Sequence, residues 1–482
     1  MRRVAFLLSS VALVAFSGQA GIAQAGGFTQ QETTIRMSDG VEIAASYFVP
    51  DGPAPAGGLP AVMLFHGLGE SRTAQNAVGI SLNDTAAQYL VPHGYAVLTF
   101  DIRGHGASGG TFALDGPREG QDTRELFDWL ASRPGIDATK IGAFGYSLGG
   151  GLVWRAAVEG VPFAAIETAV TWIDLYGALV PQNLTKSGAV ALFFNSVTSK
   201  VDGSIAPLID DLIASRNLAL IKQLLDMRST RPRLAQLRTP TFMFQGRRDF
   251  AFGMDQAIAA YRLLRGPKRL SIVDFGHSPS SKPPAEIPHA LNEGRAWFDR
   301  YLKGIPNHID TAPPVELSPE PWTGVTYHYR SLPPVKTLLL GFVGAKTISG
   351  DGSLVVSTQA GKEALETFGT PLLRVQATLS GGWPRLVAVL SARTRDGREI
   401  VVSEGGVNTT SLSGKHVLSI RLISNSTPVP RGSRLVVTLA ASSTAQAANN
   451  LLYLNLPIPT GVRVSLRGVS LTLPVLRKVI SR

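Results

Sequence analysis

The sequence predicts a mostly parallel, doubly wound α/β sheet domain with a helical insertion, followed by an all-β sandwich. Residues 30 to about 307 alternate short apolar runs with longer helical patterns, which is typical of a parallel sheet with crossover helices. After roughly residue 313, short strand-like runs are separated by Gly, Ser, Asn and Asp turns, as in a sandwich. The expected boundaries are 26–310 for the α/β domain, 172–236 for its insertion, 311–334 for a Pro-rich connection and 335–482 for the sandwich.

Residues 1–25 have the three parts of a secretory signal peptide. Arg2 and Arg3 give a positive start, residues 4–16 form an apolar run, and Ala23-Gln24-Ala25 offers a small-x-small cleavage pattern. The apolar run is shorter than the roughly 20 residues that span a bilayer. We therefore expect cleavage near Ala25 and a secreted or periplasmic protein.

Within the α/β domain, continuous apolar runs mark the strands, because strands covered on both faces are apolar throughout rather than alternating. The predicted strands are 59–65, 95–100, 141–145, 241–245 and 270–275. Helical spacing of apolar residues predicts helices over 118–132, 147–158 and 292–302.

The segment 172–236 interrupts this rhythm between two core strands and is helix-prone. An insertion at that point covers the rim of the site, as a lid does. Phe193 and Phe194 within it suggest an apolar substrate group, although core packing explains them equally well.

Strand-like runs in the sandwich cover 354–357, 373–379, 386–390, 416–423 and 435–440. No long helical pattern intervenes, so this part is predicted to be all β.

Composition excludes some chemistry. The chain has no cysteine, which rules out disulfides, cysteine nucleophiles and cysteine-ligated metals. Its formal net charge of +11 is dispersed, without a run of five or six basic residues. We therefore expect no nucleic-acid partner, and weak association with anionic surfaces stays open. The oligomeric state is not predicted.

The motif Gly145-Tyr146-Ser147-Leu148-Gly149 predicts a serine nucleophile. An apolar strand precedes it and a helical pattern follows it, which is the strand–turn–helix context that exposes such a hydroxyl. Small residues on both sides let the tight turn close.

An acid and a base should follow the nucleophile along the chain. Asp249 comes just after one core strand and His277 just after the next, so both side chains can meet above the same sheet edge. Asp255 and Asp274 are the rivals of Asp249, and His289 is the rival of His277. Asp274 is expected within its strand and Asp255 at the start of a helix.

Two backbone N–H groups are expected to hold the developing oxyanion, that of Leu148 and that of Leu68, with Gly67 as the alternative to Leu68. His66 is expected to shape its turn rather than to act as a base. The glycine-rich loop 101–110 is interpreted as architectural, and His105 has no metal-binding partner at useful spacing. We expect neither a metal nor a cofactor.

These segments together resemble the α/β-hydrolase superfamily. They are Phe65-His66-Gly67, the loop 101–110, the motif around Ser147, Asp249 and Gly276-His277. The glycine-rich loop and the β-rich C-terminal part further resemble the X-prolyl dipeptidyl-peptidase and cocaine-esterase family, whose C-terminal domain is a jelly roll; residues 370–442 look like it. The resemblance implies ester hydrolysis or release of Xaa-Pro dipeptides without a cofactor.

The leading hypothesis is a cofactor-free serine hydrolase of small carboxylic esters. A dipeptidyl-peptidase or amidase acting on peptide substrates is the alternative of the same fold. The loop His66-Gly67-Leu68-Gly69-Glu70 has the form common in simple esterases and lacks the family's usual tyrosine, which favours esters. A non-catalytic polymer-binding protein is the alternative of another class, and Trp383 and Tyr453 are its candidate exposed aromatics.

Overall fold

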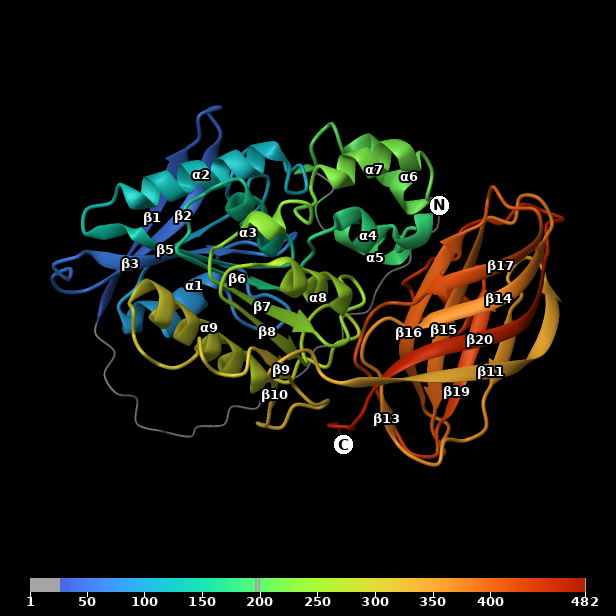
Figure 1. The fold of residues 1–482 in the computed structure, drawn as a ribbon. Coiled ribbons are helices and arrows are strands. Elements are labelled where there is room, and N and C mark those ends of the chain that lie inside the picture. The colour runs from blue at the N-terminus through green and yellow to red at the C-terminus, as the bar shows by residue number, and fades with distance from the viewer. Residues whose placement is uncertain (1–26, 196, 198–199, 482) are drawn as a thin grey trace, which may run out of the picture.

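A ten-stranded sheet organises the first part of the chain (Figure 1). The computed structural model describes residues 27–195, 197 and 200–481, so the predicted signal segment 1–25 lies outside the described residues. In spatial order the strands are β1 (Phe28–Arg36), β2 (Glu42–Pro50), β4 (Ala96–Phe100), β3 (Leu59–Phe65), β5 (Ile136–Tyr146), β6 (Ala165–Ala169), β7 (Thr241–Gly246), β8 (Lys268–Val273), β9 (Val315–Leu317) and β10 (Tyr327–Tyr329). The strands from β4 to β9 in this order run parallel. At the two edges of the sheet the pairing is antiparallel, between β1 and β2, between β2 and β4, and between β9 and β10.

The five predicted strands of this sheet correspond to β3, β4, β5, β7 and β8. Sequence reasoning missed β1, β2 and β6. It also expected residues 311–334 to be a connection only, whereas β9 and β10 lie there and extend the sheet beyond β8. These strands are only three residues long, too short for a hydrophobic pattern to reveal them.

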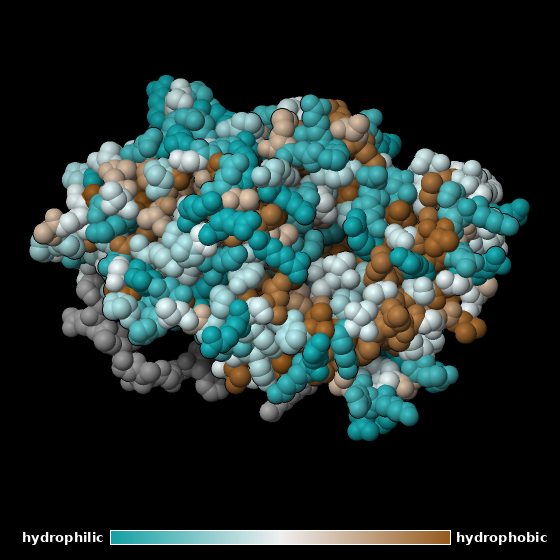
Figure 2. Space-filling model, in the orientation of Figure 1, coloured by the Kyte–Doolittle hydropathy of each residue, from teal (hydrophilic) through white to brown (hydrophobic). Residues whose placement is uncertain are grey.

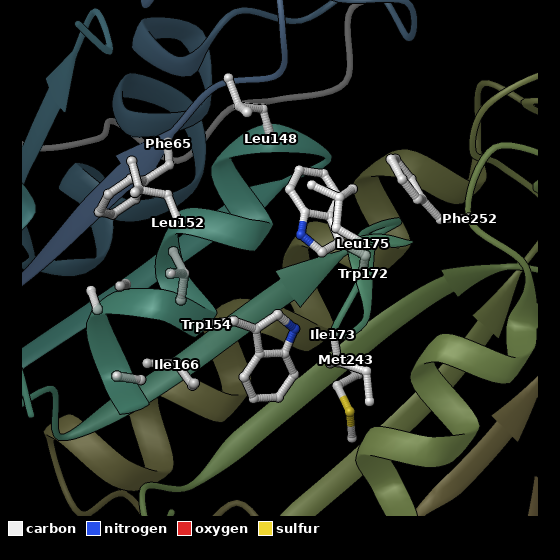
Figure 3. Close-up of a cluster of buried hydrophobic side chains, with 14 of the residues drawn as sticks. Phe65, Leu148, Leu152, Trp154, Ile166, Trp172, Ile173, Leu175, Met243 and Phe252 are labelled. Carbon is white, nitrogen blue, oxygen red and sulfur yellow. The ribbon is translucent and has the colours of Figure 1, made fainter. Parts of the chain in front are cut away.

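Helices cover both faces of the sheet. One face packs against α2 (Pro117–Ala131), α3 (Leu148–Val158) and α8 (Met254–Leu263). The other packs against the short α1 (Leu82–Thr85), a π-helical turn (Ala86–Leu90) and α9 (Glu286–Leu302), which begins six residues before the predicted start. Figure 3 shows Leu152 and Trp154 of α3 among the buried side chains above the strands. Large aromatic side chains on each face stabilise this layering, since full burial of one is worth about 1.5–3 kcal/mol.

The insertion between β6 and β7 contains four short helices, α4 (Leu175–Leu179), α5 (Ser187–Asn195), α6 (Ile209–Ile213) and α7 (Leu218–Asp226). In Figure 1 they form the green group next to the sandwich. The described part of this insertion therefore contains helices and lies between the core strands β6 and β7.

The C-terminal part is an antiparallel sandwich, and it confirms the predicted fold class. One sheet has the order β11 (Val335–Ile348), β20 (Val464–Leu476), β14 (Leu372–Leu379) and β17 (Gly414–Arg421). The other has the order β12 (Leu354–Ser357), β19 (Arg434–Ala440), β15 (Arg385–Arg393) and β16 (Glu399–Asn408), and β13 (Leu365–Glu366) pairs with β18 (Pro428–Val429) outside both. Alternate residues of β14 point into the shared core.

Trp383 and Tyr453 are not exposed, which corrects the expectation of aromatic binding residues on the sandwich. Their exposed fractions are 0% and 1%. The Trp383 indole donates to the carbonyl of Arg385 at 2.8 Å, and Tyr453 packs against Leu184 of the insertion. Both rings therefore serve packing, because a ring without accessible surface cannot stack on a polymer.

The sandwich contacts the α/β part through buried polar groups. Arg247, just after β7, is fully buried and pairs with Glu366 of β13. Its Nε donates to the carbonyl of Ser426 at 3.0 Å, and Ser426 N–H donates back to the carbonyl of Arg247 at 2.8 Å. Since buried charges require paired, hydrogen-bonded partners, these contacts fix the orientation of the two parts.

No helix in the described part of the chain is long and apolar enough to span a membrane. Figure 2 shows hydrophobic residues gathered over the sandwich on the visible face. Exposed apolar side chains of the sandwich include Leu339 and Val343 on β11, at 79% and 97% exposure, and Val417 on β17.

Candidate active site

Ser147 occupies the sharp turn between β5 and α3. Its backbone is at φ 51° and ψ −119°, a conformation that non-glycine residues rarely adopt. The turn is held by two hydrogen bonds: Ser147 N–H donates to the carbonyl of Ala169 at 2.9 Å, and Thr171 Oγ1 donates to the carbonyl of Ser147 at 2.7 Å. The strained residue is therefore fixed by β6 and the chain after it, which is how a nucleophile elbow presents its hydroxyl.

Glycines at both ends of the motif make the elbow sterically feasible. A Cβ on Gly145 would overlap the carbonyl of Gly149, and a Cβ on Gly149 would overlap the carbonyl of Phe65 on β3. Both clashes are with backbone, which cannot swing aside.

We expect Gly149→Ala to destabilise the protein by about 1–3 kcal/mol, because overpacking against backbone forces the elbow to shift. Urea unfolding measures the change. Gly57→Ala is the matched control, since a Cβ there would lie 3.8 Å from the flexible end of Lys140. Equal stability of the two variants would contradict the steric role assigned to Gly149.

His277 and Asp249 lie within hydrogen-bond distance of one another and of Ser147. Ser147 Oγ is 3.0 Å from His277 Nε2, and His277 Nδ1 is 2.7 Å from Asp249 Oδ2. Asp249 is fully buried and also accepts from the N–H groups of Phe252 and His277, at 2.8 and 3.2 Å. A carboxylate only accepts, so Nδ1 carries the proton and Nε2 is left as the acceptor facing the serine.

The rival residues bond elsewhere. Asp274 lies just past the end of β8, not within the strand as predicted; it accepts from Ser281 Oγ at 2.8 Å and from Trp322 N–H at 3.2 Å. Burial raises its pKa to about 6. Asp255 stands in the first turn of α8, as predicted, and His289 stacks on Trp322.

The segment bearing Asp249, residues 247–252, is supported by a lysine that sequence reasoning missed. Lys186 of the insertion is buried, and its Nζ donates to the carbonyls of Phe250 and Ala251 at 2.9 and 2.8 Å. Burial lowers its pKa to about 8. The insertion thus stabilises the position of Asp249 from one side, while the sandwich does so through Arg247.

Of the predicted oxyanion donors, Leu148 directly follows Ser147, and Leu68 lines the same cavity as Ser147. Leu148 is the first residue of α3, where backbone N–H groups lack partners within the helix. Gly67 N–H donates to Glu70 Oε2 at 3.2 Å, and the Tyr146 hydroxyl donates to the same carboxylate oxygen. Because Gly67 is already occupied, Leu68 is the better candidate for the second donor.

His66 and the loop 101–110 hold the surrounding backbone. His66 Nδ1 donates to the carbonyl of Gly67 at 2.7 Å, and its Nε2 accepts from Ile102 N–H at 2.9 Å. Burial lowers the pKa of His66 to about 3, so the ring is neutral. Asp101 accepts from Arg72 N–H at 2.7 Å and Ala107 N–H at 2.8 Å. Among the described residues, no group of three metal-binding side chains occurs.

A cavity of about 250 Å³ opens beside Ser147 and His277. Its wall is mostly apolar and includes Phe193 of α5, whereas Phe194 is buried in the core. The polar residues of its wall include Glu70, Tyr146 and Glu167, none of which sequence reasoning singled out. For Glu167 a signal existed: a carboxylate in the middle of the apolar run Ala165–Ala169.

Comparisons with known proteins agree with this architecture. The model of the X-Pro dipeptidyl-peptidase (S15) family matches residues 39–201. An uncharacterized Mycobacterium tuberculosis protein is 28% identical over 137 residues, 28% of this chain and 44% of that protein. An uncharacterized 31.7 kDa Escherichia coli protein is 30% identical over 143 residues, 30% of this chain and 46% of that protein. The match thus spans less than half the length of these curated relatives.

Solved structures are similar along both parts of the chain. A CocE/NonD family hydrolase from Staphylococcus aureus has a TM-score of 0.71 at 15% identity, covering 94% of this chain and 97% of its own. An aminopeptidase from a marine sediment Thaumarchaeota archaeon has a TM-score of 0.68 at 16% identity, covering 94% and 97%. An α-amino acid ester hydrolase has a TM-score of 0.68 at 14% identity, covering 95% and 98%. These neighbours establish the fold, and the family match over residues 39–201 agrees with the resemblance seen in the sequence.

Proposed function

We propose that this protein is an exported serine hydrolase that cleaves carboxylic esters through an acyl-enzyme on Ser147. The observation that carries the proposal is the chain of contacts from Ser147 Oγ to His277 Nε2, 3.0 Å, and from His277 Nδ1 to Asp249 Oδ2, 2.7 Å, at the wall of an apolar cavity. Nucleophile and base within hydrogen-bond reach, with the base oriented by a third group, are the requirements for this chemistry.

In the proposed reaction, His277 Nε2 takes the proton of Ser147 as Oγ adds to the ester carbonyl carbon. The oxyanion accepts hydrogen bonds from the N–H groups of Leu148 and Leu68. His277 then gives its proton to the departing alcohol, which leaves the acyl group on Ser147. A water molecule, deprotonated by His277, releases the carboxylic acid and restores the serine.

A peptidase or amidase is the second candidate, and Glu70 is the observation in its favour. This side chain lines the cavity close to the oxyanion loop and already accepts hydrogen bonds from Gly67 and Tyr146. A carboxylate there could pair with the free amine of a dipeptide. Parallel assays of p-nitrophenyl esters and Xaa-Pro p-nitroanilides decide between them, and faster cleavage of the anilides would reverse the order of preference.

The activated serine is tested by labelling the purified protein with a fluorophosphonate probe. We expect the wild type to react with the probe. Ser147→Ala should lose labelling because it has no hydroxyl to react, and His277→Ala should lose it because the hydroxyl is a weak nucleophile without its base. Circular dichroism of each variant controls for folding. A folded wild type that stays unlabelled contradicts the mechanism and favours a non-catalytic binding protein.

The proposal of export is based only on the signal-like pattern of residues 1–25. When the full chain is expressed in a bacterium, we expect protein recovered from the periplasm or medium to begin at Gly26. Intact-mass measurement of that fraction checks this, and an uncleaved chain retained in the cytoplasm would contradict it.

A further inference from the structure

Glu167 is a buried carboxyl group for which the proposed chemistry has no use. It lies on β6, where its register partners are Phe144 of β5 and Phe242 of β7, and it is 3% exposed. Its Oε1 has no hydrogen-bond partner among the residues that the structure describes. An unsatisfied buried polar group destabilises the folded protein, so its presence in a central strand calls for an explanation.

The cavity beside Ser147 reaches this carboxyl group. Ser147 and His277 belong to its wall, and so does Glu167. In the register of β5 and β6, Tyr146 pairs with Ala169 and Phe144 with Glu167. Glu167 therefore lies about three residues below the level of the nucleophile, or roughly 10 Å at about 3.3 Å per residue. A cavity of that length suits a chain rather than an acetyl group.

Most of the cavity wall is apolar. It is formed by side chains from the strands β3, β5, β6 and β7, from the turn after α1 and from α9: Leu64, Leu90, Phe144, Ala169, Phe244 and Phe298. Such a wall favours methylene groups, whose removal from water lowers the free energy.

Helix α9 leaves room for the carboxyl group at the far end. Gly294 faces Glu167, and a Cβ at this position would lie 2.5 Å from Glu167 Oε2. The space that the carboxyl group occupies beside α9 therefore depends on a glycine, and the residue is also part of the cavity wall.

The groups next to Glu167 favour a neutral partner. Burial raises the pKa of Glu167 well above its ordinary value, which favours the protonated carboxyl group, and this form can donate as well as accept hydrogen bonds. Arg295 also lines the cavity, and its ion pair with Asp299 at 2.7 Å weakens its attraction for a carboxylate ligand. A hydroxyl group matches a protonated carboxyl group without burying a further charge.

We propose that the cavity binds the acyl group of medium-chain esters whose far end carries a hydroxyl, with Glu167 as the hydrogen-bond partner of that hydroxyl. This inference rests on the proposed function of Ser147. Glu167 acts here as a specificity residue at the end of the acyl chain, remote from the bond that is cleaved.

The test compares p-nitrophenyl acetate, octanoate and ω-hydroxyoctanoate on the wild type, Glu167→Gln and Glu167→Leu. We expect kcat/KM of the wild type to favour the hydroxylated ester over octanoate by about tenfold, the worth of one hydrogen bond left unpaired by the plain chain. Glu167→Leu should remove this preference, Glu167→Gln should keep most of it, and the acetate rate should change less than about twofold in both. An unchanged preference in Glu167→Leu overturns the proposal, as does a wild-type preference for the ω-amino or ω-carboxy ester.

A binding measurement tests this inference independently of whether Ser147 is catalytic. Ser147→Ala protein, with and without Glu167→Leu, is titrated calorimetrically with methyl octanoate and methyl ω-hydroxyoctanoate. Tighter binding of the hydroxylated ester that is lost in Glu167→Leu supports the proposal even if the wild type cleaves no ester. Equal affinities for the two esters overturn it even if Ser147 proves catalytic.

Discussion

Asp249→Asn is expected to lower kcat for p-nitrophenyl esters by about 10⁴-fold, a loss of the size seen when the acid of a serine triad becomes an amide. The asparagine can donate from its amide to His277 Nδ1, which then favours the wrong tautomer and leaves the proton on Nε2. Ser147 would then face a donor in place of an acceptor. Steady-state kinetics measure the effect, and KM should change little because Asp249 is fully buried and not part of the cavity wall.

Asp274→Asn is the matched control, since Asp274 is the nearby acid whose hydrogen bonds go to Ser281 and Trp322. We expect its kcat to stay within about tenfold of the wild type. If kcat falls more in Asp274→Asn than in Asp249→Asn, then Asp274, and not Asp249, is the acid that orients His277.

Arg247→Met is expected to destabilise the folded protein by about 3–5 kcal/mol, because it leaves the fully buried Glu366 without its cation. Glu366 also accepts from Ile480 N–H at 2.8 Å and Ser481 N–H at 3.1 Å, so the C-terminal segment depends on the same carboxylate. Urea unfolding followed by tryptophan fluorescence measures the change. Activity should fall too, since Arg247 lies two residues before Asp249.

A double variant separates the lost charge from the lost packing. Glu366→Gln in the Arg247→Met background removes the unpaired charge and keeps an acceptor for the two N–H groups, so the double variant should be more stable than Arg247→Met alone. Arg393→Met is the surface control: its ion pair with Glu399 is half-exposed and should be worth at most about 1 kcal/mol. If the Arg247→Met and Arg393→Met variants are equally stable, the structural role of the buried pair Arg247–Glu366 is contradicted.

Some of the site could be predicted because its signals are local. The elbow around Ser147 needs small flanking residues and a strand before it, and these are consecutive in the chain. Asp249 and His277 each follow a continuous apolar strand by a few residues, and parallel strands bring their ends to one sheet edge. The structure brings the three side chains within hydrogen-bond distance.

Other features could not be predicted because no local pattern specifies them. Trp383 and Tyr453 were the candidates for exposed aromatic rings, yet packing between the two sandwich sheets buries the first and packing against the insertion buries the second. Lys186 is one lysine in a helix-prone stretch until the fold brings it to the segment that bears Asp249.

By itself, the sequence determined the fold class, the position of the elbow and the order of the three polar residues, because hydrophobic periodicity and turn chemistry act between neighbours in the chain. Only the tertiary structure decided which residues form the cavity wall, Glu167 among them, and that Arg247 and Lys186 hold the segment of Asp249. These depend on strand register and on side chains from distant segments that meet in a close-packed interior, where the space left by one residue, such as Gly294, decides what its neighbour can contact.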